Sequence, residues 1–262
     1  MAQLWRIWLG STKLELSNEL SYRFNFILKT IAVLLTSIIV PIISLLIYTI
    51  SSGIPGWSLE EFLLMNGTFL FVGGLAETFF NSMTWRTITT VWRGNYDIHL
   101  IRPVRPLVSA SLETFNPDGV PTIFVGAAII TAALLKLNLA FNITNFLLYF
   151  LIIGLALVFM YAINVAIIAL SFVFLKTWAL ANAFEDIMGL GKYPLTIYGS
   201  MGMLAFTLLF PVGLAAFYPA QAILGQLSML MIGKLALVAF AFLGFSLLVW
   251  SLWIKKYTSA GG

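Results

Sequence analysis

The chain of 262 residues is 61% hydrophobic and only 9% charged, with a mean hydropathy of +1.00. A soluble domain keeps about a quarter of its residues charged, so these values predict a polytopic membrane protein. The formal net charge of +4 is small, and the basic residues lie next to apolar segments, so no nucleic-acid partner is expected. Because the chain has no cysteine and one histidine, we expect no disulfide, no thiolate catalysis and no metal site.

The first segment, residues 1–24, carries apolar side chains near helical spacing, with charged side chains mostly off that stripe. The stripe consists of Trp5, Leu9, Leu16, Leu20 and Phe24. Charges interrupt the first thirty residues before any long apolar core, so no cleavable signal peptide is expected. We expect an amphipathic helix at the inner membrane interface, and the alternative is an ordinary lead-in to the first span.

Six apolar segments follow, each a candidate helix across a hydrocarbon core of about 30 Å. They lie at about residues 27–51, 62–85, 119–136, 145–175, 194–217 and 228–254. Pro41 predicts a kink in the first span, and the length of the fourth predicts tilt. The expected fold class is therefore all-α, with six transmembrane helices forming a single transmembrane domain over residues 1–262.

Residues 210–225, between the fifth and sixth spans, combine prolines and glycines with apolar side chains. These residues disfavour one straight helix. The pattern favours a re-entrant hairpin around Pro211, Tyr218, Pro219 and Gly225, and the alternative is a kinked helix end.

The distribution of basic residues predicts the orientation in the membrane. With the amino end inside, all of the 14 Lys and Arg residues except Lys136 and Lys234 fall on the cytosolic side. We therefore expect a multi-pass protein of the cell (inner or plasma) membrane. Both termini and the two polar loops, residues 86–118 and 176–192, should face the cytosol.

The sequence offers no pattern typical of an enzyme. The run Gly189-Leu-Gly-Lys192 lacks the earlier glycine and the following Ser or Thr of a P-loop. The motifs of intramembrane proteases are missing too, and Asp97 and His99 are spaced for different faces of a helix. We expect neither catalysis nor a bound cofactor in this chain.

Glu77 is the ionisable residue that lies well inside a predicted span. A charge there is costly and usually faces protein or water. Two interpretations are open: a structural pair with Lys29 or Arg86, or a place on a substrate or coupling pathway.

The longest polar interruption, residues 86–118, predicts a short cytosolic helix. Gly94 and Asn95 can end one helix and cap the next, while Pro103 and Pro106 prevent continuation beyond residues 96–101. Its apolar side chains need cover, from lipid headgroups or from a cleft on another protein. The candidate coupling residues are Gly94, Tyr96, Asp97, Ile98, Leu100, Ile101, Arg102, Pro103 and Arg105.

Residues 94–97 and 100–104 of this loop resemble the loop after the second span in type-two ATP-binding-cassette (ABC-2) exporter permeases of the six-span bacterial and archaeal branch. Similar stretches recur at residues 22–23, 41–48, 193–198, 210–212 and 218–225, so the resemblance covers essentially the whole chain. Basic residues often follow the position of Tyr198 in that family, whereas residues 199–202 are uncharged here. An anchoring role for those charges is therefore not expected of this chain.

The resemblance implies a half-transporter that pairs in the bilayer with an identical or sibling permease chain. Separate cytosolic ATPase subunits would hold ATP and Mg²⁺ and act on residues 96–101, with Asp97, Arg102 and Arg105 pinning the contact. Two other classes of function are considered: a non-transporting membrane scaffold or assembly protein, and a secondary transporter. The second is less favoured, because such transporters commonly carry several buried charges at mid-membrane.

Overall fold

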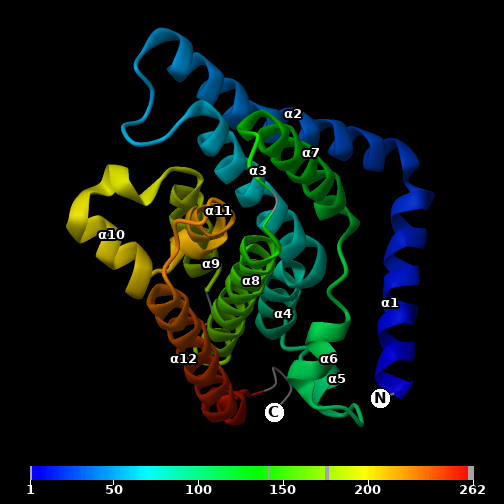
Figure 1. Ribbon diagram of the computed structural model, residues 1–262. Helices are drawn as coiled ribbons and strands as arrows, with labels where there is room; N and C mark the ends of the chain where they lie inside the picture. The colour runs from blue at the N-terminus through cyan, green and yellow to red at the C-terminus, as the bar shows by residue number, and fades with distance from the viewer. Residues whose placement is uncertain (1, 141, 175–176, 259–262) are drawn as a thin grey trace.

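All secondary structure in the described part of the chain is helical, which confirms the expected all-α class. The computed structural model describes residues 2–140, 142–174 and 177–258 (Figure 1). Residues 175 and 176, where the expected fourth span ends and the second polar loop begins, lie outside the described residues. So do residue 1 and residues 259–262 at the two ends of the expected domain.

Five helical runs among the described residues are long and apolar enough to cross a membrane. They are α2 (Arg23–Ile50), the run Leu59–Trp92, the run Pro117–Leu137, α8 (Ile143–Ser171) and the run Met229–Lys256. The second run consists of α3 (Leu59–Ala76), the π-helical turn η1 (Glu77–Asn81) and α4 (Ser82–Trp92). The third consists of η2 (Pro117–Gly119) and α7 (Val120–Leu137), and the last of α12 (Met229–Trp253) and η6 (Ile254–Lys256).

The expected fifth span, residues 194–217, is not one helix. Its residues are divided among η4 (Leu195–Tyr198), α10 (Gly199–Leu208), η5 (Val212–Ala215) and the start of α11 (Phe217–Ile223). Proline cannot donate the backbone hydrogen bond that a continuing helix needs, and Pro211 follows the end of α10. The longest apolar helical run here is Leu195–Leu208, which is shorter than a span, so a sixth membrane-spanning helix is not confirmed.

Residues 178–189, expected in a polar loop, form a helix instead, α9 (Trp178–Gly189), followed by η3 (Leu190–Lys192). The Trp178 ring contacts Trp92 at the end of α4, with centroids 5.5 Å apart. Phe184 contacts Phe159 in the middle of α8, at 6.4 Å. The segment therefore rises along α4 and α8 into the bundle, a path that polar composition alone did not indicate.

Glycines allow the backbones of α3 and α7 to lie in direct contact. A Cβ added to Gly126 on α7 would lie 2.5 Å from the Phe71 nitrogen and 2.8 Å from the Gly67 oxygen on α3. A Cβ on Gly74 would lie 2.7 Å from the Ile123 nitrogen. Small residues allow this approach, which is a common way for membrane helices to associate.

Replacement of Gly126 by alanine is expected to destabilise the protein by about 1–3 kcal/mol, the usual cost of overpacking, because backbone atoms cannot move aside as a side chain can. Gly154→Ala on α8 is the matched control. No described atom lies within 4 Å of the Cβ it adds, and alanine favours a helix by up to about 1 kcal/mol over glycine. The thermal midpoint in detergent should fall for Gly126→Ala and hold or rise for Gly154→Ala. Equal thermal midpoints for the two variants would contradict the close packing of α3 on α7.

The largest buried cluster lies where α8, α11 and α12 meet α3. Phe217 and Tyr218 of α11 are fully or almost fully buried, and Phe159 of α8 meets Phe242 of α12 at 5.1 Å. This core fixes the position of α8 and α12 side by side.

The first helix, α1 (Ala2–Ser21), contacts the rest of the chain through polar side chains and leaves most of its apolar stripe exposed, along with Arg6 and Lys13. Glu15 pairs with Arg86 at 2.8 Å, and Ser11 donates to the Leu112 carbonyl at 2.8 Å. Trp5 is 60% exposed, and Leu9, Leu16 and Leu20 are exposed as well, as is Phe24 at the start of α2. The helix is therefore present, whereas its place at a membrane interface stays a prediction.

Pro41 lies inside the continuous helix α2.

Candidate functional site

The short helix after the second span is α5 (Asp97–Leu100), and it follows a left-handed glycine. Gly94 has φ +71°, a conformation that costs glycine little. The side chain of Asn95 does not cap α5, although its carbonyl accepts from the Ile98 nitrogen at 3.4 Å. Pro106 begins the next helix, α6 (Pro106–Leu112), where a missing N–H costs nothing. The structure thus has a short helix at the predicted position, and this helix consists of a single turn.

Tyr96 anchors α5 to the ends of two long helices. The residue is 0% exposed, and its ring meets Phe172 after α8 at 5.0 Å and Tyr257 after η6 at 5.6 Å. The Tyr96 backbone N–H donates to the Tyr257 hydroxyl at 3.1 Å. Burial raises the pKa of the Tyr96 phenol, whose hydroxyl has no hydrogen-bond partner among the described residues. Tyr96 is therefore an internal anchor and does not belong to a docking face.

The other apolar side chains in and just after this helix are partly or largely exposed. Ile101 is 82% exposed, Ile98 54% and Leu100 41%. The rest of the chain covers about half of Ile98 and Leu100 and little of Ile101. Exposed apolar groups that lie together usually mark an interaction site. The anchored helix therefore presents a small apolar surface, which we call the α5 face (Ile98, Leu100 and Ile101).

The charged residues proposed to pin the contact differ in their placement. Arg102 turns inward, where it pairs with Glu113 and donates to the Ser109 hydroxyl at 2.9 Å. Asp97 and Arg105 form no ion pair within the described chain, and Arg105 is exposed along with Pro103. Arg102 thus braces α5 against α6, while Arg105 remains accessible.

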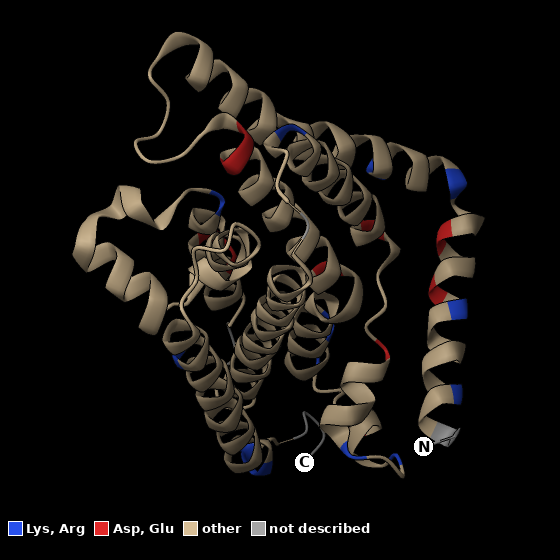
Figure 2. Cartoon of the chain, in the orientation of Figure 1, with Lys and Arg blue, Asp and Glu red and all other residues tan. Residues whose placement is uncertain are grey.

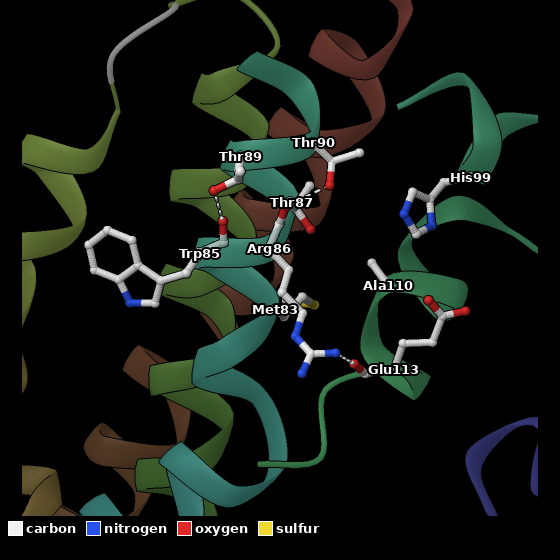
Figure 3. A pocket seen from close by; sticks show the side chains of 9 residues that line it. All are labelled: Met83, Trp85, Arg86, Thr87, Thr89, Thr90, His99, Ala110 and Glu113. Carbon is white, nitrogen blue, oxygen red and sulfur yellow. Dashed lines mark hydrogen bonds between the residues drawn. The ribbon is translucent and has the colours of Figure 1, made fainter. Parts of the chain in front are cut away.

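A cavity of about 490 Å³ separates α4 from α5 and α6 (Figure 3). In Figure 3, His99 and Glu113 lie on one side of it, opposite Arg86 and Thr90 of α4. Burial lowers the pKa of His99, the nearby Arg102 charge lowers it further, and Glu113 acts in the opposite sense. His99 is therefore largely neutral at pH 7. Arg86 closes the lower edge by donating to the Glu113 carbonyl at 3.0 Å.

The segment after α6 is hydrogen-bonded to the π-helical turn inside the second span. A π turn leaves carbonyls without their usual i→i−4 donors, and residues 114–116 supply donors to two of them. The Asn116 nitrogen donates to the Thr78 oxygen at 2.9 Å, and the Thr114 hydroxyl donates to the Phe79 oxygen. The loop and the turn therefore stabilise each other.

Glu77 is held by amides rather than by a basic residue. Its carboxylate accepts from Asn116 at 2.8 Å and from Asn81 at 3.3 Å. The suggested pairs with Lys29 and Arg86 are wrong. Lys29 binds Glu19 and Asp118, and Arg86 binds Glu15. Asp118 and Glu15 lie far from Lys29 and Arg86 along the chain, so the sequence did not show these pairs.

The polar network continues from Glu77 to α8. Asn164 donates to the Asn81 side chain at 3.2 Å and accepts from the Thr84 hydroxyl. Asn164 and Thr84 are buried, so their hydrogen bonds avoid a large cost of desolvation. Next to the network lies a cavity of about 300 Å³. Its walls are Phe69, Asn81, Thr84, Met160, Asn164, Ile167, Ala181, Phe184, Glu185, Met188 and Gly189.

Residues 211–220 of the expected re-entrant segment are buried inside the bundle, whereas Gly225 is exposed. Pro211 precedes η5, and Tyr218 and Pro219 are buried in α11. The Tyr218 and Thr207 hydroxyls share a hydrogen bond of 2.5 Å, which ties α11 to α10. Gly225 ends α11 with φ +73°. Re-entry of this segment into a membrane is not confirmed and stays a prediction.

Several site residues were not indicated by the sequence. Phe172, Trp250 and Tyr257 surround Tyr96 but read as ordinary aromatic residues at the ends of spans. Asn116 and Asn164 are polar residues whose contact with Glu77 and Asn81 depends on the tertiary fold. Asn164, inside an apolar run, was the one signal that could have pointed to the network. Among the described residues, no three acidic, His or Cys side chains form a group that could hold a metal.

Several apolar helices long enough to cross a membrane indicate the class of multi-pass membrane proteins. The family described as "ABC-2 family transporter protein" matches residues 31–261. The chain therefore belongs to the ABC-2 transporter family, as the resemblance predicts, and is a permease component of an ABC transporter system. No curated protein and no solved structure gives a match.

Proposed function

We propose that this chain is the membrane subunit of an ATP-driven exporter. It works as a dimer with an identical or sibling permease, above separate cytosolic ATPase subunits that bind ATP and Mg²⁺. The α5 face is the observation that carries the proposal. A rigidly anchored helix with Ile98, Leu100 and Ile101 turned outward is suited to receive a partner and to transmit its movement.

The distribution of charge supports the orientation. In Figure 2, basic residues occur at the C-terminal end of α12 and in the loop beside α5, on the side where both chain ends lie. Basic residues concentrate on the cytosolic side of membrane proteins. We therefore place both termini and α5 in the cytosol, with the protein in the cell membrane and the apolar face of α1 toward lipid.

In the proposed cycle, ATP-driven closure of the ATPase subunits pushes on the α5 face. Tyr96 passes the movement to Phe172 and Tyr257, and so to the ends of α8 and α12. Rotation of packed units about an interface is an established form of such transitions. A scaffold protein would use the same face to recruit a partner but would transmit no movement.

Purification of the tagged chain from its native membrane in mild detergent tests the proposal. We expect it to retain a soluble subunit that contains a P-loop and whose ATPase rate changes when the permease is added back. If the retained protein has no ATPase activity, or an activity that the permease does not alter, the chain is a scaffold and the proposal is wrong.

A further inference from the structure

The second span changes partners at its π-helical turn. Above the turn, α3 packs on α7 through Gly67, Gly74 and Gly126. Below it, α4 packs on α8, where Met83 joins the cluster of Val165, Ile168 and Ala169. The closest contacts of this continuous run thus change at η1, from α7 to α8. We call α3–α7 and α4–α8–α12 the two units, which share the largest buried cluster, where α3 also meets α8, α11 and α12.

The cytosolic segment is carried by the second of these units. Tyr96 is fixed to Phe172 and Tyr257 at the ends of α8 and η6. In α6, the Ser111 hydroxyl binds the Tyr161 hydroxyl of α8 at 2.9 Å. A force on the α5 face therefore acts on α4, α8 and α12 as a group.

The segment returns to the first unit only after α6, at the π turn. Thr114 and Asn116 bind the carbonyls of Phe79 and Thr78, and Asn116 also binds Glu77. Next to it, a Cβ on Gly119 would lie 2.5 Å from the Thr78 hydroxyl oxygen, so this part of the chain is closely seated on the turn. Glu77 accepts from both Asn116 and Asn81 and thereby links the returning segment to the turn itself.

We infer that η1 is the hinge between the α3–α7 and α4–α8–α12 units, and that Glu77 is the positioning residue that sets its resting angle. A π turn is suited to this role because its backbone bonds are shared with side chains and can be exchanged. The cavity of about 300 Å³ lies between Phe69 of α3 and Met160 of α8, and so at the boundary that the hinge would open. At the far end, the 2.9 Å bond between the Thr68 and Tyr149 hydroxyls keeps the units together.

The inference rests on the proposed function only for the source of the force, and its test uses the permease alone. Because the chain has no cysteine, spin labels attach only at introduced cysteines. One pair, at Phe124 of α7 and Leu248 of α12, reports the distance between the units. A reference pair, at Leu147 of α8 and Leu237 of α12, reports a distance within one unit. All four positions are more than half exposed.

Double electron–electron resonance in lipid nanodiscs is then compared for three variants. Glu77→Gln replaces one of the two carboxylate oxygens that accept hydrogen bonds from Asn116 and Asn81. Thr114→Val removes the hydroxyl that donates to the Phe79 carbonyl, with little change of shape, and provides the test if Glu77→Gln fails to fold. Glu60→Gln, an acidic residue at the outer end of the same run, is the matched control. We expect the distance distribution between the units to broaden or shift in Glu77→Gln or Thr114→Val and to stay unchanged in Glu60→Gln, with the reference pair unchanged throughout.

Two results would overturn the hinge: an unchanged distance between the units in both variants, or an equal change in the reference pair, which indicates general loosening. A chain that shows the hinge but binds no ATPase would refute the proposed function and leave this inference standing.

Discussion

Ile101→Asp is expected to abolish binding of the ATPase subunit while the permease still folds and inserts. Ile101 is 82% exposed, so the charge costs the isolated chain little. In a docked complex it would be buried without a partner, at a cost of several kcal/mol. Loss of a central interface contact weakens binding by at least about 2 kcal/mol, or roughly 30-fold.

Binding of the purified ATPase subunit to the permease in nanodiscs checks this result. Ile50→Asp is the matched control, because Ile50 is 83% exposed but lies at the opposite end of the first span, at the end of α2. Leu100→Asp should also uncouple ATP hydrolysis from transport, although Leu100 is only 41% exposed and its replacement disturbs the fold more. Wild-type affinity in Ile101→Asp would remove the α5 face from the mechanism.

Tyr96→Ala should lower the free energy of unfolding by about 3–5 kcal/mol, the range found for buried aromatic residues replaced by alanine. The substitution removes a side chain with 0% exposure and its ring contacts with Phe172, Tyr257 and His99. Tyr96→Phe should be neutral or stabilising, because the hydroxyl it removes is buried without a hydrogen-bond partner. Stability should therefore fall in Tyr96→Ala and not in Tyr96→Phe.

Thermal unfolding in detergent measures both changes, with Tyr22→Ala as the control because Tyr22 is 74% exposed. A large loss of stability in Tyr96→Phe would mean that the Tyr96 hydroxyl has a hydrogen-bond partner and that this bond helps to anchor α5. A loss in Tyr22→Ala equal to that in Tyr96→Ala would contradict the anchor altogether.

Local rules of the sequence predicted the elements that depend on near neighbours. Gly94 and Pro106 bound the short helix as expected, since glycine conformation and the missing proline donor act within a few residues. The helical class and most spans followed from apolar length, although the second run continues to Trp92 rather than residue 85. The expected fifth span is not confirmed because the helix ends before Pro211, and α9 was not predicted because its polar residues suggested a loop.

The site was less accessible to sequence reasoning because its contacts join distant parts of the chain. The partners of Tyr96 lie at Phe172 and Tyr257, and those of Glu77 include Asn116. Periodicity cannot show such pairs. The burial of Tyr96 could not be predicted for the same reason, since a tyrosine at that position gives the same sequence pattern whether it points outward or into the bundle.

Photo-crosslinking from position 101 tests the central claim most directly. A benzoylphenylalanine in place of the exposed Ile101 should capture, in cells, a protein that contains a P-loop and hydrolyses ATP, whereas the same group at position 50 should not. Capture of lipid alone, or of a protein without ATPase activity, would contradict the account of this chain as the ATP-driven permease.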